Sequence, residues 1–133
     1  MKTLKWFLSI VFLGLMFYLP AAGQENGDDK VYFEVDQRPE YPGGIEKMKQ
    51  FISENVSYPE EAKKEGIQGR VYVSFTINKK GEVVDTEVAK GVHSTLDAEA
   101  LRVLESMPKW TPGKKDGRAV NVRATVPVQF IVL

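Results

Sequence analysis

Few residues of this sequence could carry out chemistry. His93 is the only histidine among the 133 residues, and the chain contains no cysteine. A histidine that acts as a general base needs a second group within hydrogen-bond reach to orient it, and the residues around His93 supply no such partner. We therefore predict that His93 is a solvent-facing neighbour of a helix cap and has no catalytic role.

Metal and phosphate sites are equally poorly supported. With no cysteine and one histidine, only carboxylates are left as metal ligands, and no loop has the ligand spacing of a calcium site. The basic turn between Gly113 and Gly117 lacks the phosphate-loop pattern and leads into an expected strand. We expect no cofactor, no bound metal and no enzymatic activity. A hydrolase is the alternative class, which His93→Ala would test.

The first 23 residues differ from the rest of the chain. Lys2 and Lys5 precede an uncharged apolar run at 6–19, and small residues follow at 21–23. This layout is typical of a secretory signal peptide, and the run is shorter than the about 20 residues that a membrane-spanning helix needs. We expect cleavage after residue 23. An uncleaved membrane anchor is the alternative.

The remaining composition indicates one exported domain. The net charge of the chain is zero, which gives no reason to expect nucleic acid as a partner. Residues 24–40 should form a short linker or arm, in which Val31, Phe33 and Val35 alternate as they would in a short strand. Residues 41–133 are enough to build a hydrophobic core without disulfides.

Three helices are expected in this domain. The first begins after Pro42-Gly43-Gly44 and ends near Asn55, with an apolar face made of Ile45, Met48, Phe51 and Ile52. A short second helix begins at Pro59 and stops at Gly66, which suits the left-handed backbone after a helix. The third starts at the caps Ser94 and Thr95. Its apolar stripe consists of Leu96, Ala100, Val103, Leu104 and Met107.

Three strands complete the pattern. Residues 69–78 place apolar side chains on one face and Tyr72, Ser74 and Thr76 on the other, so only one face should be covered. A turn at 78–81 leads to a return strand at 82–90. The last strand spans 120–132, where Pro127 lacks the N–H of a central strand. We predict a two-layer α+β fold, with helices on one face of a small antiparallel sheet of about three main strands and the last strand at an edge.

Trp110 lies between Pro108 and Pro112, which restrict the backbone on both sides. A rigid tryptophan between a helix and a strand typically closes a core. We therefore expect Trp110 to be buried against the third helix and the last strand, as a structural clasp.

The motifs together resemble a known family. Y-P-E-E-A at 58–62, G-R-V-Y-V-S-F-T-I at 69–77 and G-E-V at 81–83 are similar to the signature of the TonB C-terminal domain. The resemblance continues through W-T-P-G-K at 110–114 and V-P-V-Q-F at 126–130, and it covers about residues 40–133. The helix that follows Y-P-G-G at 41–44 resembles an extension common in the Bacteroidota branch.

The resemblance implies a periplasmic domain that takes part in energy-coupled transport. In the family, a short extended segment of an outer-membrane receptor adds as a strand beside the last strand of the domain. Carried over, the implied partner-binding residues are Asn55, Val56, Ser57, Val120, Val122, Arg123, Ala124, Thr125, Val126, Gln129 and Phe130. The implied structural residues are Tyr58, Pro59, Gly66, Gly69, Trp110, Pro112 and Gly113.

Two other functions stay open from the sequence. The chain is either a membrane-anchored component of the transport machinery or an exported interaction module that is not coupled to the motor. Residues 24–40 reach only ~60 Å when extended, which limits the mechanical reach of an anchored domain. The inner-membrane motor complex and a full-length TonB are further candidate partners. Since edge strands pair between protomers, a homodimer is another candidate assembly.

Overall fold

The computed structural model describes residues 29–132. All of its named helices and strands lie in the unit that begins at Val31. The helices are α2 (Ile45–Asn55), α3 (Glu60–Lys64) and α4 (Ser94–Glu105). The strands are β1 (Val31–Tyr32), β2 (Gly69–Ile77), β3 (Val83–Lys90), β4 (Gly113–Lys115) and β5 (Arg118–Phe130).

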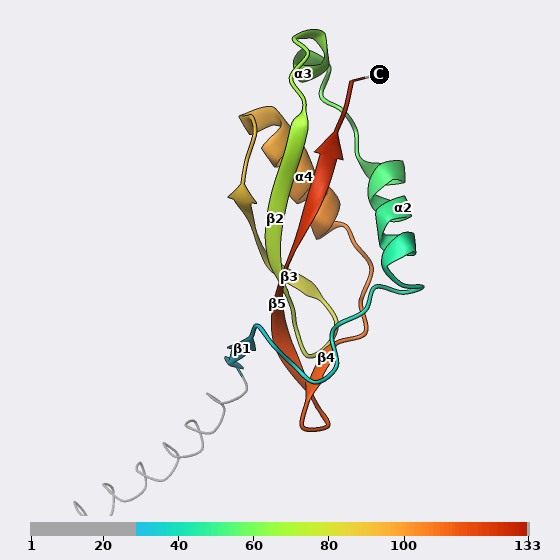
Figure 1. Cartoon of the computed structure of the whole chain (residues 1–133), viewed down its shortest axis with the longest axis vertical. Helices are drawn as coiled ribbons and strands as arrows, with labels where there is room; N and C mark the ends of the chain where they lie inside the picture. The colour runs from blue at the N-terminus through green and yellow to red at the C-terminus, as the bar shows by residue number, and fades with distance from the viewer. Residues whose placement is uncertain (1–28, 133) are drawn as a thin grey trace, which may run out of the picture. The chain divides into compact units, whose positions relative to one another are not determined.

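The sheet has the order β1-β5-β2-β3, and β4 pairs with β5. The three long strands β3, β2 and β5 are antiparallel, as predicted, and α4 packs across β2 and β3 (Figure 1). The two-residue β1 is parallel to β5 and makes the sheet mixed. The alternation of Val31, Phe33 and Val35 is therefore realised as a strand only at its beginning.

The core lies between the sheet and α4. The apolar face of β2 is fully enclosed at Val71, Val73, Phe75 and Ile77. The stripe of α4 is buried at Leu96, Ala100, Val103 and Leu104, while Met107 packs against the core from its margin. The alternation predicted for β2 and the helical spacing predicted for α4 are both confirmed, because the two apolar faces pack against each other.

The start of α4 differs from the prediction. His93 is the N-cap residue: its Nδ1 accepts a hydrogen bond from the Thr95 N–H at 3.3 Å. Ser94 is already the first helical residue, so the prediction of Ser94 and Thr95 as caps was wrong. Asp97 reaches back to accept a hydrogen bond from the Val92 N–H at 2.9 Å. His93 therefore has a structural role, satisfying one of the free N–H groups of the first turn.

The two shorter helices follow the sequence signals with one exception. α3 ends at Lys64, just before Gly66, whose φ of 69° is left-handed, and the Ile67 N–H returns to the Ala62 carbonyl at 2.9 Å. In α2, Met48 and Ile52 are buried, but Ile45 is 61% exposed. The predicted face is therefore present at helical spacing, but its first member is left uncovered.

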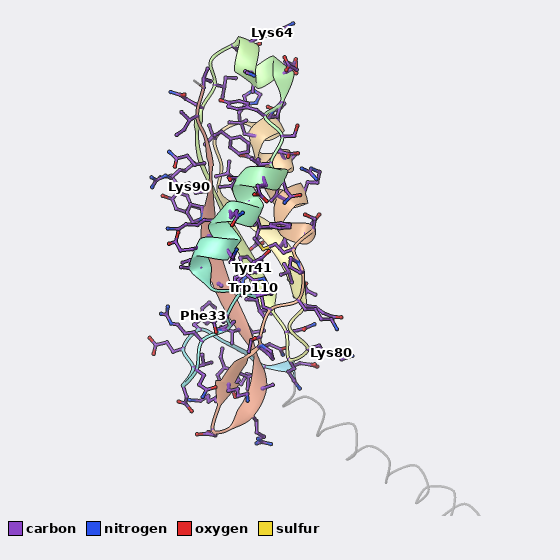
Figure 2. All side chains as sticks on the ribbon, turned by 90° about the vertical axis from the view of Figure 1, so that its right-hand side faces the viewer. Phe33, Tyr41, Lys64, Lys80, Lys90 and Trp110 are labelled. Atoms are coloured by element: carbon purple, nitrogen blue, oxygen red, sulfur yellow. The ribbon has the colours of Figure 1, made fainter. Side chains whose placement is uncertain are left out.

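Trp110 packs as a clasp at the margin of the core. The side chain is half-buried, and its ring lies 5.5 Å from that of Tyr41 and 5.7 Å from that of Phe75. Its aromatic partners therefore come from the segment before α2 and from β2, and Figure 2 shows Trp110 beside Tyr41. The backbone N–H of Trp110 donates to the Gly81 carbonyl at 2.8 Å, so this residue also fixes the β2–β3 turn.

The face of the sheet away from the helices is more enclosed than predicted. Ser74 and Thr76 are buried, with 9% and 4% of their surface exposed. The Ser74 hydroxyl lies 2.9 Å from the Thr125 hydroxyl, and Arg123 donates to the Thr76 hydroxyl at 3.1 Å. Side chains of the strands themselves cover this part of the face, so it does not need a second layer of helices.

Candidate protein-binding edge

β5 pairs with β2 in one unbroken register. The pairs run from Gly69 opposite Phe130 to Ile77 opposite Val122. Such a continuous ladder leaves β5 straight and regular over its second half. The free side of β5 therefore has the geometry that a further strand needs.

The other side of β5 is partly occupied by the chain itself. β1 pairs there with Asn121 and Val122, on the side away from β2. Among residues 29–132, no strand pairs with the outer side of the stretch 123–130. The predicted edge position is therefore confirmed for this stretch alone. At Val122 it was wrong, because the short strand β1 already pairs there.

Pro127 indicates which backbone groups point outward. It lies opposite Tyr72 of β2. Antiparallel pairs alternate between hydrogen-bonded and non-bonded positions, and a residue without an N–H fits the ladder where its nitrogen points away from the neighbour. The same alternation directs the N–H and C=O groups of Arg123, Thr125 and Gln129 to the free side. We name the stretch 123–130 the open edge.

Side chains on the open edge point to two faces. Val126, Val128 and Phe130 are buried in the core, whereas Thr125 and Gln129 are exposed. The predicted contacts Val126 and Phe130 can therefore offer a partner only their backbone. Side-chain contacts from this half of β5 come from Thr125 and Gln129.

Arg123 is held by neighbouring strands. Its guanidinium donates to the Asp85 carbonyl at 2.8 Å and to the Glu87 carboxylate at 3.0 Å, in addition to Thr76. Only 19% of the side chain is exposed. The predicted contact at Arg123 is thus also confined to the backbone, because the side chain ties β5 to β3.

A hollow of about 430 Å³ adjoins one end of the open edge. Residues 33–39, which we name the arm, form one wall, and β5 forms the other. The lining residues are Phe33, Glu34, Val35, Arg38, Pro39, Val122, Arg123, Ala124 and Thr125. Ala124 and Thr125 belong to opposite faces of β5, so the hollow lies on the strand edge itself.

The loop 55–57 lies toward the other end of the open edge. Tyr58, which follows it, packs its ring 5.6 Å from Phe130 and donates a hydrogen bond to the Ile67 carbonyl. The backbone of the loop is fixed by α4: Glu99 accepts from the Ser57 N–H at 2.6 Å, and Arg102 donates to the Asn55 carbonyl at 2.8 Å. The predicted loop and the predicted strand are thus brought together.

Glu99 is the charged centre of this arrangement. Its side chain is 12% exposed, and the hydrogen bond from Arg102 lowers the pKa of its carboxyl group. The Ser57 N–H and the charge of Arg102 act in the same direction, while burial opposes them. The carboxylate form therefore holds the loop against α4.

The predicted structural residues lie in constrained positions. Gly113 is buried, and a Cβ there would come 2.7 Å from the Val122 side chain and 3.1 Å from the Gln37 carbonyl. Pro112 precedes it and is half-buried. A Cβ on Gly69 would lie 3.0 Å from Val92. Pro59 is the N-cap of α3.

The family is decided by the comparison with known proteins. Residues 54–132 match the family described as Gram-negative bacterial TonB protein C-terminal. The chain belongs to the TonB C-terminal family. Members of this family use the domain for protein interaction and not for catalysis, which agrees with the prediction of no enzymatic activity.

Relatives of this TonB C-terminal domain come from Helicobacter pylori. Its TonB proteins of strains J99 and 26695 are 41% and 33% identical over 85 residues, which is 63% of this chain. The match covers 29% and 28% of those proteins, so the chain spans less than a third of their length. The solution structure of a Helicobacter pylori TonB C-terminal domain matches at a TM-score of 0.52 with 30% identity, over 66% of this chain and 79% of that one. The α+β fold with a mixed sheet is thereby confirmed.

The sequence prediction missed the arm as a border of the candidate edge. Phe33, Val35 and Pro39 line the hollow, yet they lie before the matched residues 54–132. The alternation of Val31, Phe33 and Val35 was a signal that this segment docks on the sheet. Within residues 29–132, no helix is long and apolar enough to cross a membrane, and no cluster of potential metal ligands occurs. The predicted signal peptide at 1–23 lies outside the described residues.

Proposed function

We propose that this chain acts in the periplasm as the docking domain of a TonB-type system. An extended segment of an outer-membrane receptor adds as a strand to the open edge, and the domain passes energy to that receptor. The observation that carries the proposal is the unpaired outer side of β5 at 123–130. Family membership supports the class of partner.

The mode of binding follows from the exposed groups. Outward N–H and C=O groups at Arg123, Thr125 and Gln129 can form a ladder with any extended backbone. α2 borders this side of the molecule, as seen by comparing Figures 1 and 2. The loop 55–57 lies near the Phe130 end, where Asn55, Val56 and Ser57 are proposed to contact the docked segment.

The test of this function is titration calorimetry with the full chain in mild detergent. The probes are synthetic peptides that span the periplasmic N-terminal segments of the outer-membrane receptors of the same bacterium. Thr125→Pro and Gln129→Pro each remove one outward N–H. Thr125→Pro also removes the hydroxyl beside the buried Ser74, so Gln129→Pro is the cleaner test. We expect each to weaken peptide binding at least tenfold, about 1.4 kcal/mol, as for the loss of one or two interface hydrogen bonds.

A matched control comes from the other edge strand. Ala89 is exposed on β3, and Ala89→Pro should leave peptide affinity unchanged. Circular dichroism should show that all three variants are folded. Unchanged affinity in folded Thr125→Pro and Gln129→Pro proteins would show that partners dock elsewhere.

The coupling to energy needs a separate experiment. An exported module without a link to the motor complex, or to a full-length TonB, would bind the same peptides. It would not restore receptor-dependent nutrient uptake to a strain from which the chain was deleted. We propose that the wild-type chain restores this uptake and that Gln129→Pro does not.

Two finer assignments remain part of the proposal. We infer that residues 1–23 are removed on export, and intact-mass measurement of the exported protein distinguishes removal from a retained anchor. We also infer that α2 and the preceding Tyr41-Pro42-Gly43-Gly44 form the extension of the Bacteroidota branch, because they lie before the matched residues 54–132.

A further inference from the structure

The arm is attached to the sheet on both sides of the hollow. At its beginning, β1 pairs with Asn121 and Val122 of β5. At its end, the Asp36 and Gln37 N–H groups donate to the Lys114 carbonyl at 3.0 and 3.1 Å. Residues 33–35 leave the strand edge between these attachments. The hollow is therefore bounded by a chain segment whose two ends are fixed.

β1 also limits how far a docked strand can extend. It occupies the outer side of β5 as far as Val122. An added strand that follows the open edge must end, or turn away, where it meets Tyr32. The hollow lies at this point, since Arg123, Ala124 and Thr125 line it. One end of the docked segment is thus directed into the hollow.

The walls of the hollow suit an uncharged side chain. Five apolar residues line it: Phe33, Val35, Pro39, Val122 and Ala124. The charges of Glu34 and Arg38 balance one another, and the guanidinium of Arg123 is paired with Glu87. With Glu87 included, these charges sum to zero, so the lining favours neither a cationic nor an anionic side chain.

Phe33 is the feature that most needs a partner. It is 77% exposed, the highest value among the large apolar side chains of residues 29–132. Figure 2 shows it beside β5, lower in the view than α2. Covering an aromatic ring removes apolar surface from water, and filling the hollow would displace on the order of ten water molecules.

We propose that the arm forms a specificity subsite, in which Phe33 covers one apolar side chain of the segment docked on the open edge. This inference rests on the proposed function and deepens it by naming a side-chain preference of the partner. The arm precedes the residues that match the family. The preference therefore belongs to this chain and does not follow from family membership.

The test is a double-mutant cycle by titration calorimetry. A receptor peptide that binds the full chain is scanned by replacing each apolar residue with serine, against the wild-type protein and against Phe33→Ser. We expect one peptide position at which serine weakens binding to the wild type about tenfold, or about 1.4 kcal/mol. At that position serine should have little further effect on binding to Phe33→Ser, because the two side chains contact each other.

The control is Ile45→Ser. It removes another exposed apolar side chain, on α2, which does not line the hollow. It should change affinity at no peptide position selectively. If Thr125→Pro and Gln129→Pro abolish binding but no peptide position is coupled to Phe33, the subsite is wrong and the docking edge stands. If no receptor peptide binds the wild type, both inferences are overturned.

Discussion

Among residues 29–132, two long strands have a side without a partner strand, β5 along 123–130 and β3, and they are built differently. The open edge of β5 belongs to a ladder without a register shift, and its exposed side chains at Thr125 and Gln129 are neutral. β3 shifts register twice against β2, between Tyr72 and Val73 and between Ser74 and Thr76. It also carries charged side chains at Asp85, Glu87 and Lys90.

Irregularity and charge are the features by which edge strands resist pairing with other chains. Asp85 has a φ of 51°, which is uncommon for a residue with a side chain. Its carbonyl accepts a hydrogen bond from Arg123 of β5. Arg123 of the regular strand β5 thus holds the irregular strand β3 in shape. We expect an added strand to pair with β5 and not with β3.

The largest expected effect comes from breaking the support of β3 at its hairpin. Gly81 has a φ of 84°, and a Cβ there would come 2.0 Å from the Trp110 carbonyl oxygen. Gly81→Ala should destabilise the fold by about 3 kcal/mol, from backbone strain and the displaced clasp. Urea unfolding followed by circular dichroism measures it.

Gly117→Ala is the matched control for this substitution. Its φ of 79° is similar, but a Cβ there would contact nothing within 4 Å. It should cost only the left-handed strain of about 1–2 kcal/mol. Equal destabilisation by the two substitutions would mean that contact with the Trp110 segment does not support β3.

A smaller effect is expected from cutting the link between the two edges. Arg123→Met keeps the apolar stem but removes the hydrogen bonds to Thr76, Asp85 and Glu87. It should cost about 2 kcal/mol, because a largely enclosed hydroxyl and a carbonyl lose a charged donor. Glu87 is 69% exposed, so Glu87→Gln should cost under about 0.5 kcal/mol. Chemical denaturation gives the loss of unfolding free energy in each variant. Similar losses would mean that the ion pair with Glu87, and not the hydrogen bond to the Asp85 carbonyl, joins β5 to β3.

The contrast between the edges was only partly visible in the sequence. The alternation in β2 and β5 and the position of Pro127 predicted the long strands and an edge, because side-chain burial imposes a period of two. One shift in β3 lies at Asp85 and the other between Val88 and Lys90, and no side-chain pattern marks either. Likewise, periodicity placed Ile45 on an apolar face but could not show that this face is covered at Met48, Phe51 and Ile52 and left open at Ile45.

Long-range backbone pairing was the second limit on prediction. The bridges from Gln37 to Lys114 and from Glu40 to Thr111 join segments far apart in the chain. Backbone groups are the same at every residue, so such pairs leave no mark on composition or spacing. Side-chain alternation at Val31, Phe33 and Val35 did predict a possible strand. The hollow beside the open edge depends on the backbone pairing of the arm, so it was not predicted.

The smallest expected effect depends on pH and concerns the loop beside the Phe130 end of the open edge. The hydrogen bond from Arg102, with the Ser57 N–H, lowers the pKa of Glu99 below its ordinary value of 4.5. A carboxyl group with a lowered pKa in the folded state stabilises the fold above pH 4.5, and this contribution is lost as the pH falls through the lowered pKa. Glu99→Gln should therefore be less stable than the wild type at pH 7, by under about 1 kcal/mol, and the difference should shrink in acid.

A control on the β3 side sharpens this last comparison. The pKa of Glu82 is also lowered, chiefly by a hydrogen bond from Asn78, but Glu82 lies exposed at the hairpin and does not fix a second segment of the chain. Glu82→Gln should change stability less than Glu99→Gln at pH 7. Urea unfolding at pH 7 and pH 3 measures both. A neutral glutamine mimics only the protonated acid, so the loss of unfolding free energy in Glu99→Gln should shrink as the wild-type carboxylate is protonated. A loss that stayed constant between these pH values would show that the loop is held by packing of Val56 and Tyr58 and not by the carboxylate.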